Sequence, residues 1–242
     1  MEKDKEKVSI IIPCYNEEDS LVNLFSKMKE VERAVKSKYN LEIIFIDDGS
    51  KDKTCEMLYS RYGARADVFI VTYPINKGYG YALREGLKRI GGDLIVTIDA
   101  DTNYDHREIP VILSLMDKNT HIIVASPFSL NGKWYGLDYR LFLSMELARI
   151  YKFLLAGKSR GISTYTSCLR VYRKSILESI IPDSNDFVAN AEILIRAIVK
   201  GYKIKEYPTK VYRREFGKSK MKIVKTIASH IRFIFKIIRK DI

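Results

Sequence analysis

The 242-residue chain has few cysteines, no long apolar run and no apolar signal core. Its three cysteines, Cys14, Cys55 and Cys168, lie far apart, which argues against a disulfide framework or a cysteine metal cluster and predicts reduced thiols. No charge-free apolar run approaches the ~20 residues that a membrane-spanning helix needs. The N-terminal segment M-E-K-D-K-E-K is charged. We therefore expect a protein that is cytoplasmic or peripheral on the cytosolic face of a membrane.

Two glycine-rich phosphate motifs are also missing. No G-x-G-x-x-G follows the first predicted strand, and G-x-x-x-x-G-K-[ST] occurs nowhere. Their absence disfavours a dinucleotide dehydrogenase and a P-loop ATPase. The three histidines, His106, His121 and His230, show no metal-ligand spacing.

Apolar runs and helical patterns alternate along the first part of the chain. Strand-like runs occupy residues 8–12, 41–46, 67–72 and 94–98, and helical patterns occupy residues 19–36, 52–62 and 80–90. This order predicts an α/β fold with a mostly parallel, doubly wound sheet and helices on both faces. In such sheets ligands bind beyond the carboxyl ends of the strands, where polar residues gather in this sequence.

The second part of the chain continues the α/β pattern. Helices are predicted at residues 108–116, 138–156 and 187–200, and strands at residues 121–126, 167–172 and 203–207. The helix at 138–156 has apolar side chains over more than one stripe. It suits either a core helix or a helix that lies against lipid, and both interpretations stay open.

Two carboxylates, Asp99 and Asp101, stand one residue apart at the tip of the apolar strand 94–98. Hard oxygen ligands suit Mg²⁺ or Mn²⁺, and such ions usually sit between carboxylates and substrate phosphates. The competing interpretation is a solvated turn with two surface acids, since a lone D-x-D motif occurs often by chance.

The C-terminal segment is strongly basic. Residues 205–242 hold 12 Lys and Arg against three acids, a net +9 of the chain's +12. On a helical wheel the basic residues of 221–240 fall within roughly 100°, opposite an apolar side. This pattern predicts a helix lying in the plane of a membrane surface. A core helix with a solvated basic face, or a nucleic-acid groove, are the alternatives, and we expect no nucleic-acid partner.

Seven short motifs follow one another in order: P-C-Y-N-E-E (13–18), I-D-D-G-S-K-D-K-T (46–54), N-K-G-Y-G-Y-A (76–82), D-A-D-T-N (99–103), T-S-C-L-R-V-Y-R (166–173), A-E-I-L-I-R-A (191–197) and R-E-F-G-K-S-K-M (214–221). Together they resemble the motifs of family-2 glycosyltransferases of the GT-A fold, particularly dolichol-phosphate mannose synthases and other polyprenyl-phosphate hexosyltransferases. The resemblance implies a GT-A domain at residues 1–218 and a basic amphipathic helix at residues 219–242.

The resemblance also implies a role for particular residues. The nucleoside of a nucleotide sugar would be held by Pro13, Tyr15, Glu17, Ile46 and Asp48. Asp99 and Ala100 would line the ribose and phosphate, and Asp101 with Asn103 would bind Mg²⁺ or Mn²⁺. Arg214 and Lys220 would close over the phosphates, and Arg140 and Arg170 would contact the acceptor phosphate.

Some positions depart from the family's pattern. Asn103 replaces the usual Gln, and Cys168 and Leu169 replace Gly and Phe. Many relatives that glycosylate hydroxyls carry an E-D pair where this chain has Ala189 and Asn190, neither of which can act as a base. A phosphate monoester, whose second pKa is near 6, is already largely anionic. The missing base therefore points to a lipid-phosphate acceptor, although Glu192 could serve as a base instead.

Three functions remain in competition. The first is an inverting, metal-dependent hexosyltransferase that uses GDP-mannose or UDP-glucose and a polyprenyl phosphate, with or without a separate membrane subunit. The second is a family-2 enzyme acting on a glycan or glycolipid hydroxyl. The third is a non-catalytic membrane or nucleic-acid binding protein. The intact D-A-D and the 13–17 segment disfavour the third.

Overall fold

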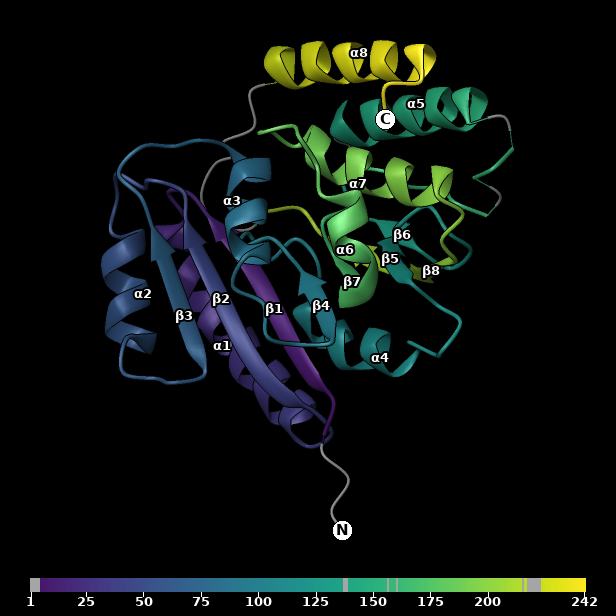
Figure 1. Cartoon of the computed structure of the whole chain (residues 1–242). Helices are drawn as coiled ribbons and strands as arrows, with labels where there is room; N and C mark the ends of the chain where they lie inside the picture. Colours follow the sequence, from purple (N-terminus) through teal and green to yellow (C-terminus); the bar gives the residue numbers. More distant parts are fainter. Residues whose placement is uncertain (1–4, 137–138, 156, 160, 215, 217–222) are drawn as a thin grey trace.

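A seven-stranded, mostly parallel sheet forms the centre of the computed structural model, which describes residues 5–136, 139–155, 157–159, 161–214, 216 and 223–242 (Figure 1). The strand order is β3 (Val68–Thr72), β2 (Asn40–Asp47), β1 (Lys7–Cys14), β4 (Leu94–Thr97), β7 (Arg170–Arg173), β5 (Ile122–Ser126) and β8 (Ile204–Pro208). Only β7 runs antiparallel to its neighbours β4 and β5 within this sheet. The predicted fold class is confirmed.

Helices cover both faces of the sheet, as the alternation of side chains along β1 requires. Ile10 and Ile12 face a core built with α1 (Glu18–Lys36), α2 (Thr54–Tyr62) and α4 (Ile109–Ser114). Ile11 faces the opposite core, built with α3 (Tyr79–Leu87), α5 (Tyr139–Leu154), α6 (Lys174–Leu177), α7 (Val188–Val199) and α8 (Ile223–Arg239). All three isoleucines are fully buried, which explains why β1 reads as a continuous apolar run.

Smaller elements had no clear sequence pattern. They are two 3-10 helices, η1 (His106–Glu108) and η2 (Glu178–Ile180), the helix α6, and a two-stranded ribbon of β6 (Lys133–Trp134) and β9 (Lys210–Val211). The ribbon lies next to the segment that follows β4, because the Tyr212 N–H donates to the Asn103 carbonyl at 2.9 Å.

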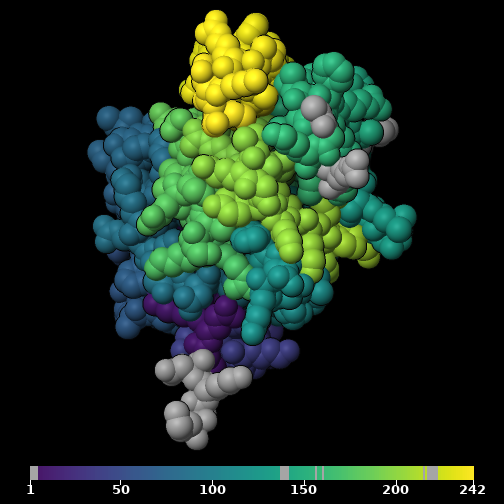
Figure 2. Space-filling model, turned by 45° about the vertical axis from the view of Figure 1, so that its right-hand side comes forward, coloured from purple at the N-terminus to yellow at the C-terminus, as the bar shows by residue number. Residues whose placement is uncertain are grey.

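The C-terminal helix α8 packs on the body of the protein and also leaves apolar residues exposed. It lies beside α5 and α7 at the top of Figure 1, and it forms a ridge in Figure 2. His230, Phe233 and Ile237 are buried, and the Tyr151 hydroxyl of α5 lies 2.7 Å from His230 Nδ1. A second face exposes apolar side chains: Val224, Ile227, Ile231, Phe235 and Ile238. The helix thus packs on the protein by one face and exposes another, and its binding to a membrane stays a prediction.

None of the described helices combines the length and the hydropathy that crossing a bilayer requires.

Candidate functional site

One cavity of about 410 Å³ opens at the carboxyl ends of β1, β2 and β4. It brings together nine of the predicted site residues: Pro13, Tyr15, Glu17, Asp48, Asp99, Ala100, Asp101, Asn103 and Arg214. These residues come from segments more than a hundred positions apart in the chain. The topology of the parallel sheet explains the convergence, because the carboxyl ends of its strands lie at one edge.

The segment after β4 fits a divalent cation. Asp101 accepts hydrogen bonds from the backbone N–H of Asn103 at 3.2 Å and from its Nδ2 at 2.9 Å. Asn103 Oδ1 is buried and has no hydrogen-bond partner, so an amide oxygen is left to act as a ligand. Burial, and then the nearby charge of Asp101, raise the pKa of the Asp99 carboxyl well above its usual range. A cation beside the two carboxylates would relieve that repulsion.

The backbone of Thr102, in the segment after β4, has a strained conformation. Its φ of 57° lies in the left-handed region, which a β-branched residue rarely adopts. Two side chains of α1 hold it there: Asn23 Nδ2 donates to Thr102 Oγ1 at 3.0 Å, and Lys27 Nζ donates to its carbonyl at 3.2 Å. These two contacts could not be predicted from the sequence, because both residues lie on the polar face of an ordinary amphipathic helix.

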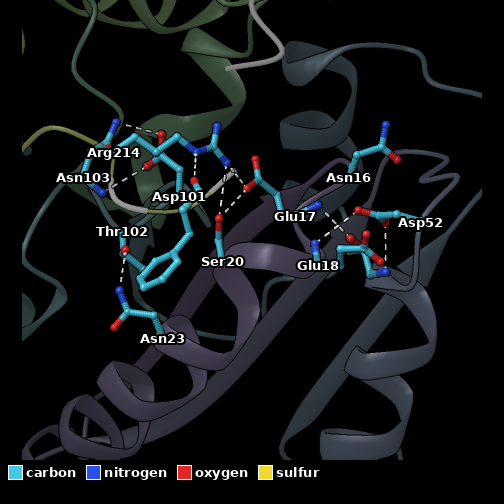
Figure 3. Close-up of polar contacts among 12 residues, drawn as sticks. Asn16, Glu17, Glu18, Ser20, Asn23, Asp52, Asp101, Thr102, Asn103 and Arg214 are labelled. Carbon is cyan, nitrogen blue, oxygen red and sulfur yellow. Dashed lines mark hydrogen bonds and ion pairs between the residues drawn. The ribbon is translucent and has the colours of Figure 1, made fainter. Parts of the chain in front are cut away.

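Arg214 lies beside the two acidic segments. Figure 3 shows it close to Asp101 and Asn103, with Glu17 and Ser20 next to them. Its guanidinium forms an ion pair with Glu17, which also accepts a hydrogen bond from the Ser20 hydroxyl at 3.0 Å. Burial raises the pKa of Glu17, and Arg214 opposes that rise. The cavity therefore holds a cationic group that is partly buried and placed next to the predicted metal segment.

Hydrogen bonds from backbone N–H groups to side-chain oxygens join the segments after β1 and β2. The backbone N–H groups of Asn16 and Glu17 donate to Ser50 Oγ at 2.9 Å and to Thr54 Oγ1 at 2.7 Å. The Glu18 N–H donates to Asp52 Oδ2 at 3.2 Å, as Figure 3 shows. Ser50, Asp52 and Thr54 of the I-D-D-G-S-K-D-K-T motif therefore fix the backbone of residues 16–18, whose neighbour Tyr15 lines the cavity with Glu17.

Asp48 holds the segment after β3, which also lines the cavity. Its carboxylate accepts the N–H groups of Lys77 at 2.7 Å and of Gly78 at 2.8 Å. Gly78 has a φ of 101°, and a Cβ there would lie 2.3 Å from the Asn185 carbonyl oxygen. Only glycine fits this turn, which places Asn76 and Tyr79 in the cavity lining.

Four predicted site residues are not found in this lining. Ile46 is fully buried in the core on β2. Arg170 is also fully buried, and its guanidinium donates to the carbonyls of Asn190 at 2.6 Å and Tyr165 at 2.7 Å. Its predicted contact with an acceptor phosphate is therefore corrected to a structural role, since both bonds go to backbone oxygens inside the protein. Lys220 and the side chain of Arg140 lie outside the described residues.

Arg170→Met should lower the melting temperature by roughly 10 °C, because two buried carbonyls would lose charged donors and about 3 kcal/mol or more. Arg173→Met is the matched control on the same strand. Arg173 also donates to two backbone carbonyls, of Thr120 and Asp117, but it is partly exposed, so water can replace it. Thermal unfolding of both variants measures the difference. A stable Arg170→Met protein with weakened acceptor binding would restore the acceptor role.

The start of α7 contributes residues that the sequence did not single out. Asp186 and Phe187 line the cavity, whereas Glu192 does not. Glu192 accepts the N–H groups of Asp183 and Ser184, both at 3.0 Å, so its role is structural. Asp186 accepts the N–H of Val188, the first residue of α7, at 3.0 Å. An acid just before an amphipathic helix was the only sequence signal.

Residues of α5 and α8 line another part of the cavity, and several of them are apolar. Leu143 and Leu147 of α5 line it, together with Ile223 and Ile227 of α8. Polar and charged residues also contribute to this lining: Ser144, Thr164, Thr166, Lys225, Thr226 and His230. The site can therefore take a ligand with a charged head and an apolar extension.

Comparison with known proteins agrees with this geometry. The family model described as "Glycosyl transferase family 2" matches residues 9–181. The chain is 30% identical to a dolichol-phosphate mannosyltransferase of Pyrococcus furiosus over 96% of its own length and 64% of that protein. It is 29% identical to an undecaprenyl-phosphate 4-deoxy-4-formamido-L-arabinose transferase of Serratia proteamaculans over 92% of its length and 65% of that protein. The chain thus spans slightly less than two thirds of each relative.

Solved structures share the fold. Glucosyl-3-phosphoglycerate synthase of Mycobacterium tuberculosis, in complex with Mn²⁺ and UDP-glucose, superposes with a TM-score of 0.69 at 17% identity, over 96% of this chain and 78% of that one. The same enzyme with Mn²⁺, UDP and glucosyl-3-phosphoglycerate gives a TM-score of 0.66 at 18% identity, with the same coverage of both chains.

Proposed function

The chain belongs to glycosyl transferase family 2, and from that premise we propose that it moves a hexose from a nucleotide sugar to a polyprenyl phosphate at a membrane surface. It is a glycosyltransferase related to polyprenyl-phosphate sugar transferases. The observation that carries the proposal is the cavity lined both by carboxylates with Arg214 and by apolar side chains of α5 and α8.

The part of the cavity lined by the carboxylates and Arg214 suits the nucleoside diphosphate of the donor, with GDP-mannose and UDP-glucose as the candidates. Pro13, Tyr15 and Asp48 line the wall proposed for the nucleoside. Asp101 and Asn103 would hold Mg²⁺ or Mn²⁺, which supplies positive charge for the departing diphosphate, and Asp99 would line the ribose and phosphate. Arg214 adds a fixed cation there. Negative charge grows on the leaving group during transfer, so such groups lower the barrier electrostatically.

The part of the cavity lined by α5 and α8 suits a lipid phosphate. Ala189 and Asn190 are buried, and neither lines the cavity, so no base stands where hydroxyl-specific relatives carry one. A phosphate oxygen needs no base, because it is already ionised at neutral pH. The apolar lining from α5 and α8 offers a surface for the first isoprene units.

We also propose that the protein binds the cytosolic face of a membrane through α8, without assigning a membrane subunit. The exposed apolar face of α8 is flanked by basic residues: Lys225, Arg232, Lys236 and Arg239. Such a helix inserts its apolar face at the headgroup boundary and attracts anionic lipids. The division into residues 1–218 for transfer and 219–242 for docking stays part of this proposal.

An acceptor comparison tests the proposal. The protein is incubated with Mn²⁺ and radiolabelled GDP-mannose or UDP-glucose, and with either a polyprenyl phosphate or the matching alcohol. We expect labelling of the phosphate at least ~100-fold faster than that of the alcohol, since the alcohol must lose a proton without a base. Equal labelling of both lipids would contradict the phosphate acceptor.

One observation favours a second function, transfer to a glycan or glycolipid hydroxyl. Asp186 is a carboxylate in the cavity lining and could accept a proton. It already accepts hydrogen bonds from the Val188 N–H and from Ser229 Oγ. Strong labelling of the alcohol, lost in Asp186→Asn, would establish this alternative.

A further inference from the structure

Trp134 is the only tryptophan of the chain, and no proposed role uses it. Its partly exposed side chain lines the same cavity as Asp101 and Asn103. A large aromatic ring beside a predicted metal site is a candidate contact for whatever group lies next to the metal.

Backbone hydrogen bonds fix the position of Trp134 relative to the metal segment. Trp134 pairs with Val211 across β6 and β9, and the Tyr135 N–H donates to the Val211 carbonyl at 2.8 Å. Val211 forms a bridge with Tyr104, and the Tyr212 N–H donates to the Asn103 carbonyl at 2.9 Å. The ribbon therefore ties the tryptophan to the residues that directly follow Asp101.

The indole ring of Trp134 packs against Phe128 on one face, and its N–H can donate a hydrogen bond to a ligand. Phe128 stacks on it with ring centroids 6.1 Å apart and an interplanar angle of 2°. Among the described residues, no acceptor takes a hydrogen bond from the indole N–H. An aromatic ring in a fixed position, with an N–H group that can donate, suits a ligand that has an apolar face and hydroxyl groups at its edge.

The order of groups in the donor identifies that ligand. The nucleoside wall, with Pro13 and Asp48, belongs to β1 and β2, and the metal segment follows β4. A hexose attached to the diphosphate must lie beyond the metal, on the side away from the nucleoside. The β6–β9 ribbon is joined to that segment. We infer that Trp134 forms the floor of the donor-hexose subsite, where its ring packs on the C–H face of the sugar; this inference rests on the proposed function.

Intrinsic fluorescence tests the inference directly, because Trp134 is the sole indole. The full chain with Mn²⁺ is titrated with UDP, GDP, UDP-glucose, GDP-mannose and a polyprenyl phosphate. We expect the accepted nucleotide sugar to quench and shift the emission, and the matching nucleoside diphosphate to leave it nearly unchanged. A response to the polyprenyl phosphate but not to the nucleotide sugar would overturn the inference.

Variants separate sugar binding from nucleotide binding. Trp134→Ala should raise KM for the nucleotide sugar roughly 10- to 100-fold, since a packed aromatic contact is lost. It should change the inhibition constant of the nucleoside diphosphate less than about twofold. Trp134→Phe keeps a ring and should restore most of the binding. Tyr135→Ala is the control, because Tyr135 is exposed and outside the cavity lining.

The outcomes distinguish two failures. If calorimetry finds no binding of UDP or GDP with Mn²⁺ to the folded wild-type protein, the proposed function fails and the inference fails with it. If the nucleotide binds and Trp134→Ala, folded by circular dichroism, keeps the wild-type KM for the nucleotide sugar, the inference alone fails.

Discussion

Replacing Asp101 by asparagine is expected to lower sugar transfer by at least ~10³-fold, because charge stabilisation by a metal contributes several kcal/mol to such reactions. Asparagine keeps the size of the side chain but removes the charge beside the unpaired Asn103 Oδ1. Radiolabel transfer under saturating Mn²⁺ measures the loss. Calorimetry of Mn²⁺ binding in the presence of a nucleoside diphosphate should show a parallel loss of metal affinity.

Asp105→Asn is the matched control for this experiment. Asp105 is an acid four positions further along the same segment, but it pairs with Arg107 and does not line the cavity. Its substitution should leave transfer within about threefold of the wild type, since exposed ion pairs contribute little. Transfer by Asp101→Asn within tenfold of the wild type would contradict the metal site proposed for Asp101 and Asn103.

The sequence predicted the sheet and most of the cavity because both depend on local patterns. Apolar, β-branched runs marked β1, β2 and β4, and the polar residues that follow each run line the cavity. Once the sheet is parallel, those strand ends must meet. This explains why Asp48 and Asp101 share one cavity although no local pattern links them.

The motifs did not predict which of their residues are buried. Arg170 and Ile46 belong to motifs of the family, yet both are fully buried. A motif gives the type of residue and its spacing, whereas its environment depends on distant segments. Arg170 is buried because Asn190 and Tyr165, from α7 and the segment before β7, offer carbonyls to it. The ribbon that holds Trp134 was missed because its two-residue strands show no periodicity.

For the C-terminal helix α8, too, the sequence pattern did not predict which face is buried. A wheel of residues 221–240 identified one apolar and one basic side, and it did not identify the face that packs on the protein. That face is compositionally mixed, with Thr226 and His230 beside Phe233 and Ile237. The helix therefore has a packed face, an exposed apolar face and a basic face, and only the last two follow from hydropathy.

Removing the outward apolar face of α8 is expected to abolish most binding to lipid vesicles. Ile231 and Phe235 are 49% and 56% exposed, so about half of each side chain is free to enter a membrane. Replacing both by asparagine should remove about 3 kcal/mol of partitioning, or a factor of roughly 100. Vesicle sedimentation measures binding, and the melting temperature should change little because both side chains are exposed.

A double substitution on the opposite side of the molecule provides the control. Val111 and Leu115 are 47% and 46% exposed, close to the α8 pair. They lie in and directly after α4, at the lower end of Figure 1 and away from α8. Val111→Asn with Leu115→Asn should bind vesicles like the wild type. Equal losses in the two double variants would mean that α8 has no special role in docking.

Charge should act only when the lipid is anionic. Arg232 and Lys236 are exposed on the basic side of α8, and each is expected to contribute about 1 kcal/mol near an anionic surface. Replacing both by glutamine should weaken binding to anionic vesicles roughly 30-fold and leave binding to neutral vesicles nearly unchanged. The apolar pair should matter on both kinds of vesicle. Because Ile227 lines the cavity and is itself 39% exposed, a membrane bound to this helix would lie next to the part of the site proposed for the lipid phosphate.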